Sequence, residues 1–465
     1  MDVSAESGSA RQAYDRMRAA YLKDGPLPLK LRHKLLRAIE RAISVRKDEL
    51  VSAVSADFRG RAPSEIFRAE LMTTYSAARH ARSHLKEWVQ PEPIELPTLF
   101  RPGRARIEYQ PLGVVGIISP WCDPIRLSIT PLISAIAAGN RVILKPSELT
   151  PQTSALLSSM LPDVLGSDNV AVVYGGPELG AAVSALPLDH LLFTGSASVG
   201  RKVLSAASTN LTPVTLAVGG CSPALVHDSY SIPKAAQRIM LGKLAGAGQT
   251  GLAPDYVLCP ADKVDAFVKA FSASAAKRYP TLAANEGYTA IINRAHRERL
   301  SALVSAATGA GATAHEINPG SEDLSASPKM APVLLTGVPE DAEVLRAELL
   351  GPVLPIVPYT SLPDAIRYVN ERPPPLRLYY FDSSRRRARE LVERTASGSV
   401  TSNFVLASGA QHLLSVGGEN GGFAGFETFS HRKPIHEVGR LTLLPIFQRP
   451  ALARLVRALM RLLMV

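Results

Sequence analysis

Two short motifs carry side chains that could bind a nucleotide. The first is Lys145-Pro146-Ser147-Glu148, which follows the apolar run 141–144. The Lys145 amine can donate to ribose hydroxyls or to a 2′-phosphate, and the Glu148 carboxylate can accept from a ribose. The second is Gly195-Ser196-Ala197-Ser198-Val199-Gly200, between a predicted strand and a predicted helix, where free backbone amides favour a pyrophosphate. Either motif alone is common in loops, but together and in this order they predict a dinucleotide site.

The cysteines are the other candidates for chemistry. Cys122, Cys221 and Cys259 are too few and too scattered to form a disulfide framework. No Cys and His cluster has the spacing of a zinc site, so no metal centre is expected. Cys259 ends an apolar run and is predicted to be core. Cys122 and Cys221 are read as small structural side chains, with a nucleophilic Cys122 as the alternative.

The elements that must position these residues alternate between strands and helices from Gly113 onward. Such alternation predicts a parallel, doubly wound sheet, which binds ligands at the carboxyl ends of its strands. A second α/β region is expected to begin near Thr215. Upstream, residues 30–56 predict one amphipathic helix, residues 64–90 predict another helical stretch, and the extended segment to Tyr109 suggests a hairpin. The predicted strands of the first region cover residues 114–119, 141–145, 170–174 and 188–193, and its helices cover 124–138 and 151–165.

Composition indicates a large globular protein. The chain has 465 residues, of which 46% are hydrophobic and 20% charged, and a net charge of +11. The basic excess lacks interleaved aromatic residues and any nucleic-acid-binding signature, so no nucleic-acid partner is expected. The polar start of the chain lacks a secretory signal, which predicts a cytoplasmic protein.

Many ordered motifs resemble the aldehyde dehydrogenase superfamily, in particular the class-3-like branch that includes coniferyl aldehyde dehydrogenases. The resemblance covers nearly all of residues 30–440. It rests on the segments 109–118, 120–121, 138–140, 145–148, 193–196, 219–220, 222–223, 253–256, 351–356 and 428–432.

The resemblance implies an α/β fold with a Rossmann-type NAD(P)-binding domain, an α/β catalytic domain and a small oligomerisation arm. The implied NAD(P)-binding domain takes residues 1–85 and 110–214, and the catalytic-type domain takes 215–405. The oligomerisation arm and channel loop take 86–109 and 406–440. The implied ligands are NAD or NADP and an aldehyde or related small molecule. By resemblance, the cofactor contacts are Trp121, Lys145, Glu148, Gly195, Ser196 and Glu348.

The catalytic set that the resemblance implies is not intact. Gly251 occupies the place of the nucleophilic cysteine, in Gly248-Gln249-Thr250-Gly251. Ala217 replaces the general-base glutamate two residues before Gly219-Gly220, and Cys122 replaces the oxyanion asparagine after Pro120-Trp121. These three losses predict absent or strongly impaired aldehyde oxidation. Asp123 and Arg126 fall where the family has apolar channel residues, so they either make the channel polar or form a salt bridge that fills it.

Residues 441–465 form a basic tail. Arg454, Arg457 and Arg461 lie three and four residues apart, on one face of a predicted helix whose other face is apolar. Such a helix suits an anionic membrane surface, or it packs on a partner subunit. We therefore expect a cytoplasmic protein with peripheral membrane contact as one reading of the tail.

Three functions remain open at this point. The first is a nucleotide-binding family member without catalysis, acting as a homodimer or as a regulatory subunit of an active paralogue. The second is an active NAD(P)-dependent oxidoreductase for an aromatic or long-chain aldehyde. The third is a membrane-surface scaffold with a vestigial nucleotide site.

Overall fold

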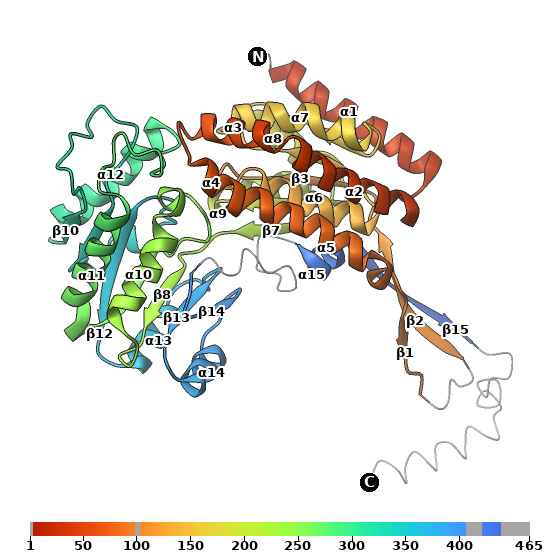
Figure 1. The fold of residues 1–465 in the computed structure, drawn as a ribbon. Coiled ribbons are helices and arrows are strands. Elements are labelled where there is room, and N and C mark those ends of the chain that lie inside the picture. The colour runs from red at the N-terminus through yellow and green to blue at the C-terminus, as the bar shows by residue number, and fades with distance from the viewer. Residues whose placement is uncertain (1–2, 98–102, 406–420, 439–465) are drawn as a thin grey trace, which may run out of the picture.

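A computed structural model describes residues 3–97, 103–405 and 421–438, which form three β-sheets (Figure 1). The first sheet has five parallel strands in the order β5-β4-β3-β6-β7. β3 and β4 are wholly buried between helices on both faces, and their residues are apolar apart from Arg141 and Lys145 at the two ends of β4. The strands are β3 (Val114–Ile118), β4 (Arg141–Lys145), β5 (Val170–Val172), β6 (His190–Gly195) and β7 (Val214–Val218).

Helices cover both faces of this sheet, as the doubly wound prediction requires. Successive residues of β3 show this division, since Val115 and Ile117 pack into one core and Val114 and Ile118 into the other. The first core is covered by α2 (Leu29–Val45), α3 (Lys47–Asp57), α5 (Met72–Trp88), α6 (Arg126–Ala138), α7 (Pro151–Leu165) and α15 (Gly422–Thr428). The second core is covered by α1 (Val3–Asp24), α8 (Pro177–Ser184) and α9 (Ala197–Ser208).

The second sheet has seven strands in the order β10-β11-β12-β9-β8-β13-β14, parallel except for β10. Its strands are β8 (Pro223–Val226), β9 (Tyr256–Pro260), β10 (Thr313–Glu316), β11 (Val333–Thr336), β12 (Val353–Tyr359), β13 (Leu378–Phe381) and β14 (Val400–Ser402). The surrounding helices are α10 (Ile232–Lys243), α11 (Val264–Arg278), α12 (Arg294–Gly309), α13 (Leu362–Asn370) and α14 (Arg385–Arg394). Cys259 is fully buried in this core, as predicted.

The third sheet is antiparallel and projects from the rest of the molecule (Figure 1). It consists of β1 (Glu92–Ile94), β2 (Arg104–Pro111) and β15 (Ser430–Glu437). The expected hairpin before Tyr109 is thus present, formed by β1 and β2. The role of this sheet in oligomerisation and the division of the chain into functional domains stay predictions.

Some sequence-based expectations need correction. Residues 30–56 form two helices, because the chain leaves helical geometry at Arg46. β7 is hydrogen-bonded to β6, so Thr215 still belongs to the first sheet and the second sheet begins with β8. The helix α1 was not predicted, because its sequence is mostly polar and only a narrow stripe around Tyr14 and Met17 is buried.

The described helices and the basic tail bear on the expected membrane contact. In the part of the chain that the structure describes, no helix has both the length and the apolar character needed to cross a bilayer. The basic tail at 441–465 lies outside the described residues, as does most of the predicted channel loop with Glu419.

The buried side chain of Asn140 joins three segments around the first sheet, and this generates a stability prediction. Its Oδ1 accepts from the Gly113 amide at 2.9 Å, and its Nδ2 donates to the carbonyls of Ala135 at 3.1 Å and Phe429 at 2.9 Å. Asn140→Ala should lower the free energy of unfolding by about 3 kcal/mol, because buried polar groups lose their partners. Urea denaturation followed by circular dichroism measures the change. Exposed Asn210→Ala is the control and should cost less than about 1 kcal/mol; equal losses would contradict this account.

Candidate functional site

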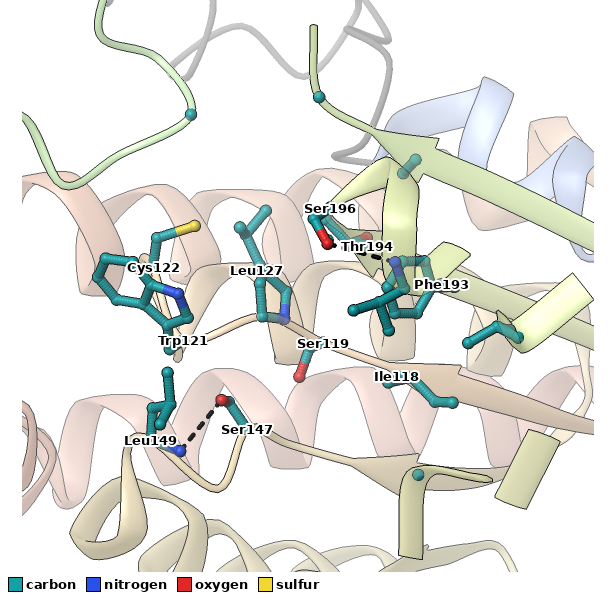
Figure 2. A pocket seen from close by; sticks show the side chains of 18 of the residues that line it. Ile118, Ser119, Trp121, Cys122, Leu127, Ser147, Leu149, Phe193, Thr194 and Ser196 are labelled. Carbon is teal, nitrogen blue, oxygen red and sulfur yellow. Dashed lines mark hydrogen bonds between the residues drawn. The ribbon is translucent and has the colours of Figure 1, made fainter. Parts of the chain in front are cut away.

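A cavity of about 530 Å³ lies at the carboxyl ends of β3, β4, β6 and β7, a size typical of small-molecule sites. Figure 2 shows Ser119, Ser147 and Ser196 around it, with Trp121 and Cys122 at one side. All the residues predicted from sequence as cofactor contacts or as occupants of catalytic positions line this one cavity. They are Trp121, Cys122, Lys145, Glu148, Gly195, Ser196, Ala217, Gly251 and Glu348. The structure brings these residues together, and their roles stay predictions.

The first wall of the cavity is the turn after β4. Lys145 is the last residue of that strand and is buried, whereas Glu148 is exposed at the rim. The Lys145 Nζ donates to Glu148 Oε2 at 2.5 Å. The hydroxyl of Ser147 accepts from the Leu149 amide at 3.2 Å, which closes the turn (Figure 2). An amine and a carboxylate are therefore held side by side, a pair that can donate to and accept from neighbouring hydroxyls.

The second wall is the turn from β6 into α9. The Ser196 side chain caps this helix by accepting from the Val199 amide at 3.4 Å (Figure 2). A Cβ on Gly195 would lie 2.6 Å from the Phe193 ring, so only glycine lets the chain turn here. The N-terminal amides of α9 thus face the cavity, where they favour an anionic group.

The third wall holds Glu348. A Cβ on Gly219 would lie 2.5 Å from the Glu348 carboxylate, so the missing side chain makes room for that group. Burial raises the pKa of Glu348 to about 7, with a further contribution from Asp255, against the opposing effect of Arg299 and Arg377. None of the described residues donates a hydrogen bond to the Glu348 carboxylate.

Asp255 holds the backbone around this wall and was not identified from sequence as a site residue. Its two carboxylate oxygens accept from the amides of Ser222 at 2.8 Å and Leu349 at 3.0 Å. One buried side chain therefore fixes both the segment that follows Gly219 and the residue that follows Glu348. Its effect is on the position of Glu348, since Asp255 itself does not line the cavity.

The other end of the cavity contains Gly251. Among the residues that the structure describes, none outside its own chain neighbours has a heavy atom within 4 Å of where its Cβ would stand. Its carbonyl accepts from Arg377 Nη1 at 2.9 Å, which holds the backbone in place. The position has the room for a side chain and none is present.

Two of the cysteines, Cys122 in the lining of the cavity and Cys221 outside it, are poorly suited to form a thiolate. Burial raises the pKa of Cys122 far above its usual value, and the charges of Asp123 and Glu348 add to the effect. Burial also raises the pKa of Cys221, to about 12. Ala217 lies buried at the same end and contributes only a methyl group.

Asp123 and Arg126 form the salt bridge that the sequence analysis gave as one of two alternatives. The Asp123 carboxylate accepts from Arg126 Nη2 at 2.7 Å, from Arg61 Nη2 at 2.9 Å and from the Thr250 hydroxyl at 2.6 Å. Burial alone would raise the pKa of Asp123, but Arg126 and Arg61 outweigh it and lower the pKa to about 2. A carboxylate with this low basicity and these partners is not a general base at neutral pH.

Glu70 completes the buried charge cluster, which we define as Arg61, Glu70, Asp123 and Arg126. Its carboxylate accepts from Arg61 Nη1 at 2.8 Å and from the Ile125 amide at 2.7 Å. Glu70 lies in a π-helical turn, Phe67–Leu71, between α4 (Pro63–Ile66) and α5. Arg61 and Glu70 were missed from sequence, because only the fold brings them to residues about 60 positions away.

Comparisons with known proteins agree with the motif resemblance. A probable coniferyl aldehyde dehydrogenase of Caulobacter vibrioides is 40% identical over 435 residues, covering 91% of this chain and 90% of that protein. Aldehyde dehydrogenase family 3 member A2 of Pongo abelii is 35% identical over 433 residues, covering 90% and 86%.

A solved structure described as the substrate-bound state of Staphylococcus aureus AldH has a TM-score of 0.86 at 32% identity, covering 93% of this chain and 94% of that one. The predicted fold and the predicted resemblance are therefore confirmed. The model of the aldehyde dehydrogenase family matches residues 3–438, and the chain belongs to that family.

Proposed function

We propose that this chain is a nucleotide-binding aldehyde dehydrogenase homologue that has lost, or strongly impaired, aldehyde oxidation by a nucleophile of its own. Gly251 carries the proposal. At the position that corresponds to the family nucleophile there is no side chain, while the space for one is open to the cavity. Without a covalent adduct at the carbonyl carbon, an aldehyde has no ready hydride to give up.

The residues at the other end of the cavity fit NAD(P), and this supports the nucleotide part of the proposal. Lys145 and Glu148 would hold the adenosine ribose, and the amides at the start of α9 would hold the pyrophosphate. Glu348 would accept from the hydroxyls of the nicotinamide ribose. When bound, the nicotinamide supplies a hydride acceptor. Gly195 and Gly219 leave room for the Phe193 ring and the Glu348 carboxylate, and Glu348 remains in the lining of the cavity.

The remaining catalytic functions are also unfilled at this end. Ala217 offers no carboxylate to activate water, and the Cys122 thiol is a weaker donor to an oxyanion than an amide side chain. Asp123 is the carboxylate nearest to Thr250, and it is held by two arginines. The proposed loss therefore involves attack, oxyanion stabilisation and hydrolysis together.

The names of the relatives favour a second function, oxidation of a coniferyl-like aromatic aldehyde by an active NAD(P)-dependent enzyme. A long-chain aldehyde is the other substrate class expected from the sequence. Such activity would need another nucleophile, for which Cys122 is the candidate that lines the cavity. The high pKa of its buried thiol opposes this role.

The proposals on assembly and location extend the first function. The chain would act in the cytoplasm as a homodimer, or paired with an active paralogue as a regulatory subunit. The antiparallel sheet of β1, β2 and β15 would serve as the pairing arm. A third function, a membrane-surface scaffold, depends on the tail that lies outside the described residues.

The first prediction tests the proposed function directly. Isothermal titration with NAD+ and NADP+ should show binding of at least one of them, and Lys145→Ala should weaken it about tenfold, or 1.4 kcal/mol. Exposed Lys234→Ala is the matched control and should bind normally. With nucleotide and an aldehyde panel alone, no NAD(P)H absorbance should develop. Binding of neither nucleotide, or turnover that Cys122→Ala abolishes, would overturn the proposal.

A second prediction concerns pH. Ribose hydroxyls donate to the ionised form of Glu348, whose pKa is about 7 in the nucleotide-free protein. Protonation at lower pH therefore opposes binding, and affinity should rise by up to about tenfold from pH 6 to pH 8. Glu348→Gln should remove the pH dependence, whereas Glu343→Gln, an exposed glutamate nearby, should keep it. A flat profile in the unaltered protein would argue against a role for Glu348 at the ribose.

A third prediction tests whether the frame still supports the chemistry. Gly251→Cys with Cys122→Asn should give one NAD(P)H per chain and then stop, because no carboxylate activates water. Adding Ala217→Glu should raise steady-state turnover about 10²–10⁴-fold, the usual contribution of a general base. Gly251→Ser in the same background is the control, and it should stay inactive because a hydroxyl is a weaker nucleophile than a thiolate. If the triple variant folds, binds nucleotide and remains inactive, groups beyond these three have been lost.

A further inference from the structure

The end of the cavity around Gly251 differs from the nucleotide end in the side chains that line it. Its walls are apolar side chains together with two arginines, and it is continuous with the nucleotide end. The lining residues here are Cys122, Arg126, Leu127, Leu252, Leu376 and Arg377. A ligand group at this point therefore meets apolar contacts and positive charge, without a cysteine side chain from position 251.

The arginines make an anion more stable here than burial alone would. Arg126 lowers the pKa of the Cys122 thiol against the effect of burial, and Arg377 does the same for the carboxyl of Glu348. The charges of both arginines therefore act on groups that line the cavity. At Cys122, however, burial and the charges of Asp123 and Glu348 outweigh Arg126, so a small thiol entering beside Gly251 would arrive protonated and lose its proton on attack. A polarisable sulfur also suits the apolar contacts of Leu252 and Leu376.

The lack of a general-base carboxylate at position 217 is also consistent with a free thiol as the nucleophile. A general-base carboxylate is needed when an acyl group stays attached to the protein and must be hydrolysed. An acyl group that is bound to a free thiol leaves with that thiol, and no hydrolysis is required. Ala217 would then be sufficient at its position. The empty place at Gly251 and the methyl group at Ala217 are accounted for by one change of reaction.

We propose that the space beside Gly251 is the binding site of a low-molecular-weight thiol, which serves as the second substrate. The inference rests on the proposed nucleotide binding. The thiol sulfur forms a bond to the aldehyde carbon, the carbonyl π electrons move to its oxygen, and the thiol proton passes to water. The carbon–hydrogen bond of the resulting thiohemiacetal then breaks, and its hydride with both electrons reduces NAD(P)+. The products are a free thioester, NAD(P)H and one proton, so atoms and electrons balance.

The test uses the full chain with NAD(P)+, octanal or benzaldehyde, and either β-mercaptoethanol or N-acetylcysteine. Neither aldehyde has an olefin next to the carbonyl that would consume the thiol by addition. NAD(P)H should form only when thiol is present, at a rate that rises with thiol concentration, and mass spectrometry should detect the thioester. A phosphine reductant in place of the thiol should give no NAD(P)H, which excludes simple reduction of the protein cysteines.

Substitutions that fill the space beside Gly251 test the proposed thiol site. Gly251→Leu should lower the thiol-dependent rate about 100-fold by displacing the thiol, and Gly251→Ala should have a smaller effect of the same sign. Gly309→Leu is the matched control, because that glycine also has open space around its Cβ but lies at the end of α12, away from the cavity. Retained nucleotide binding in each variant shows that it has folded.

A binding readout makes the inference independent of turnover. Calorimetry without nucleotide should show that the thioester S-benzoyl-N-acetylcysteine binds the unaltered chain and binds Gly251→Leu far more weakly. Nucleotide binding with no response to thiol would overturn this inference and leave the proposed function standing. Failure to bind nucleotide would overturn the proposed function itself. Formation of the free acid without thiol would overturn both and support the active second function.

Discussion

The buried carboxylate of Asp123 is the point on which the carbonyl end of the cavity depends. It joins Arg61, Arg126 and Thr250, so it ties the N-terminal helices to the loop before α6 and to the residue next to Gly251. Asp123 also has a positive φ of 46°, an unfavourable backbone conformation for a non-glycine residue. Removing one member of such a buried set leaves an unpaired charge, which costs about 3–5 kcal/mol. The loop that carries Trp121 and Cys122 is therefore fixed by charge pairing.

The same N-terminal segment holds both loops of this end. Glu70 accepts from the Ile125 amide, and Glu65 accepts from the Gly246 amide at 3.1 Å. Glu65 lies on α4 and Glu70 lies in the π-helical turn. The extra residue of that turn sets the helical register between the two glutamates. Carboxylates that accept from backbone amides set where Cys122 and Gly251 stand. The space at Gly251 is thus bounded by backbone that these two carboxylates hold in place.

Local patterns predicted most of the fold, because apolar runs and turn residues act over a few positions. The strands 114–119 and 141–145 and the helix 151–165 were identified in this way. The break at Arg46 and the pairing of β7 with β6 were not, since both depend on packing between distant segments. At the site, motifs located the cavity residues of the nucleotide end. The partners of Asp123 could not be found from sequence, because Arg61 and Thr250 are 62 and 127 positions away.

The contrast between the two ends of the cavity limits which reactions are reasonable. At the nucleotide end, Lys145 with Glu148, the start of α9 and Glu348 offer donors and acceptors of the kinds that would suit a dinucleotide. At the other end, the groups that are absent are those needed to form and hydrolyse an acyl group on the protein. The groups that remain there include Arg126, which is paired with Asp123, and Arg377, which donates to the Gly251 carbonyl, beside apolar walls. A site of this composition can orient a carbonyl and a separate nucleophile against a bound nucleotide, provided that the nucleophile comes from solution.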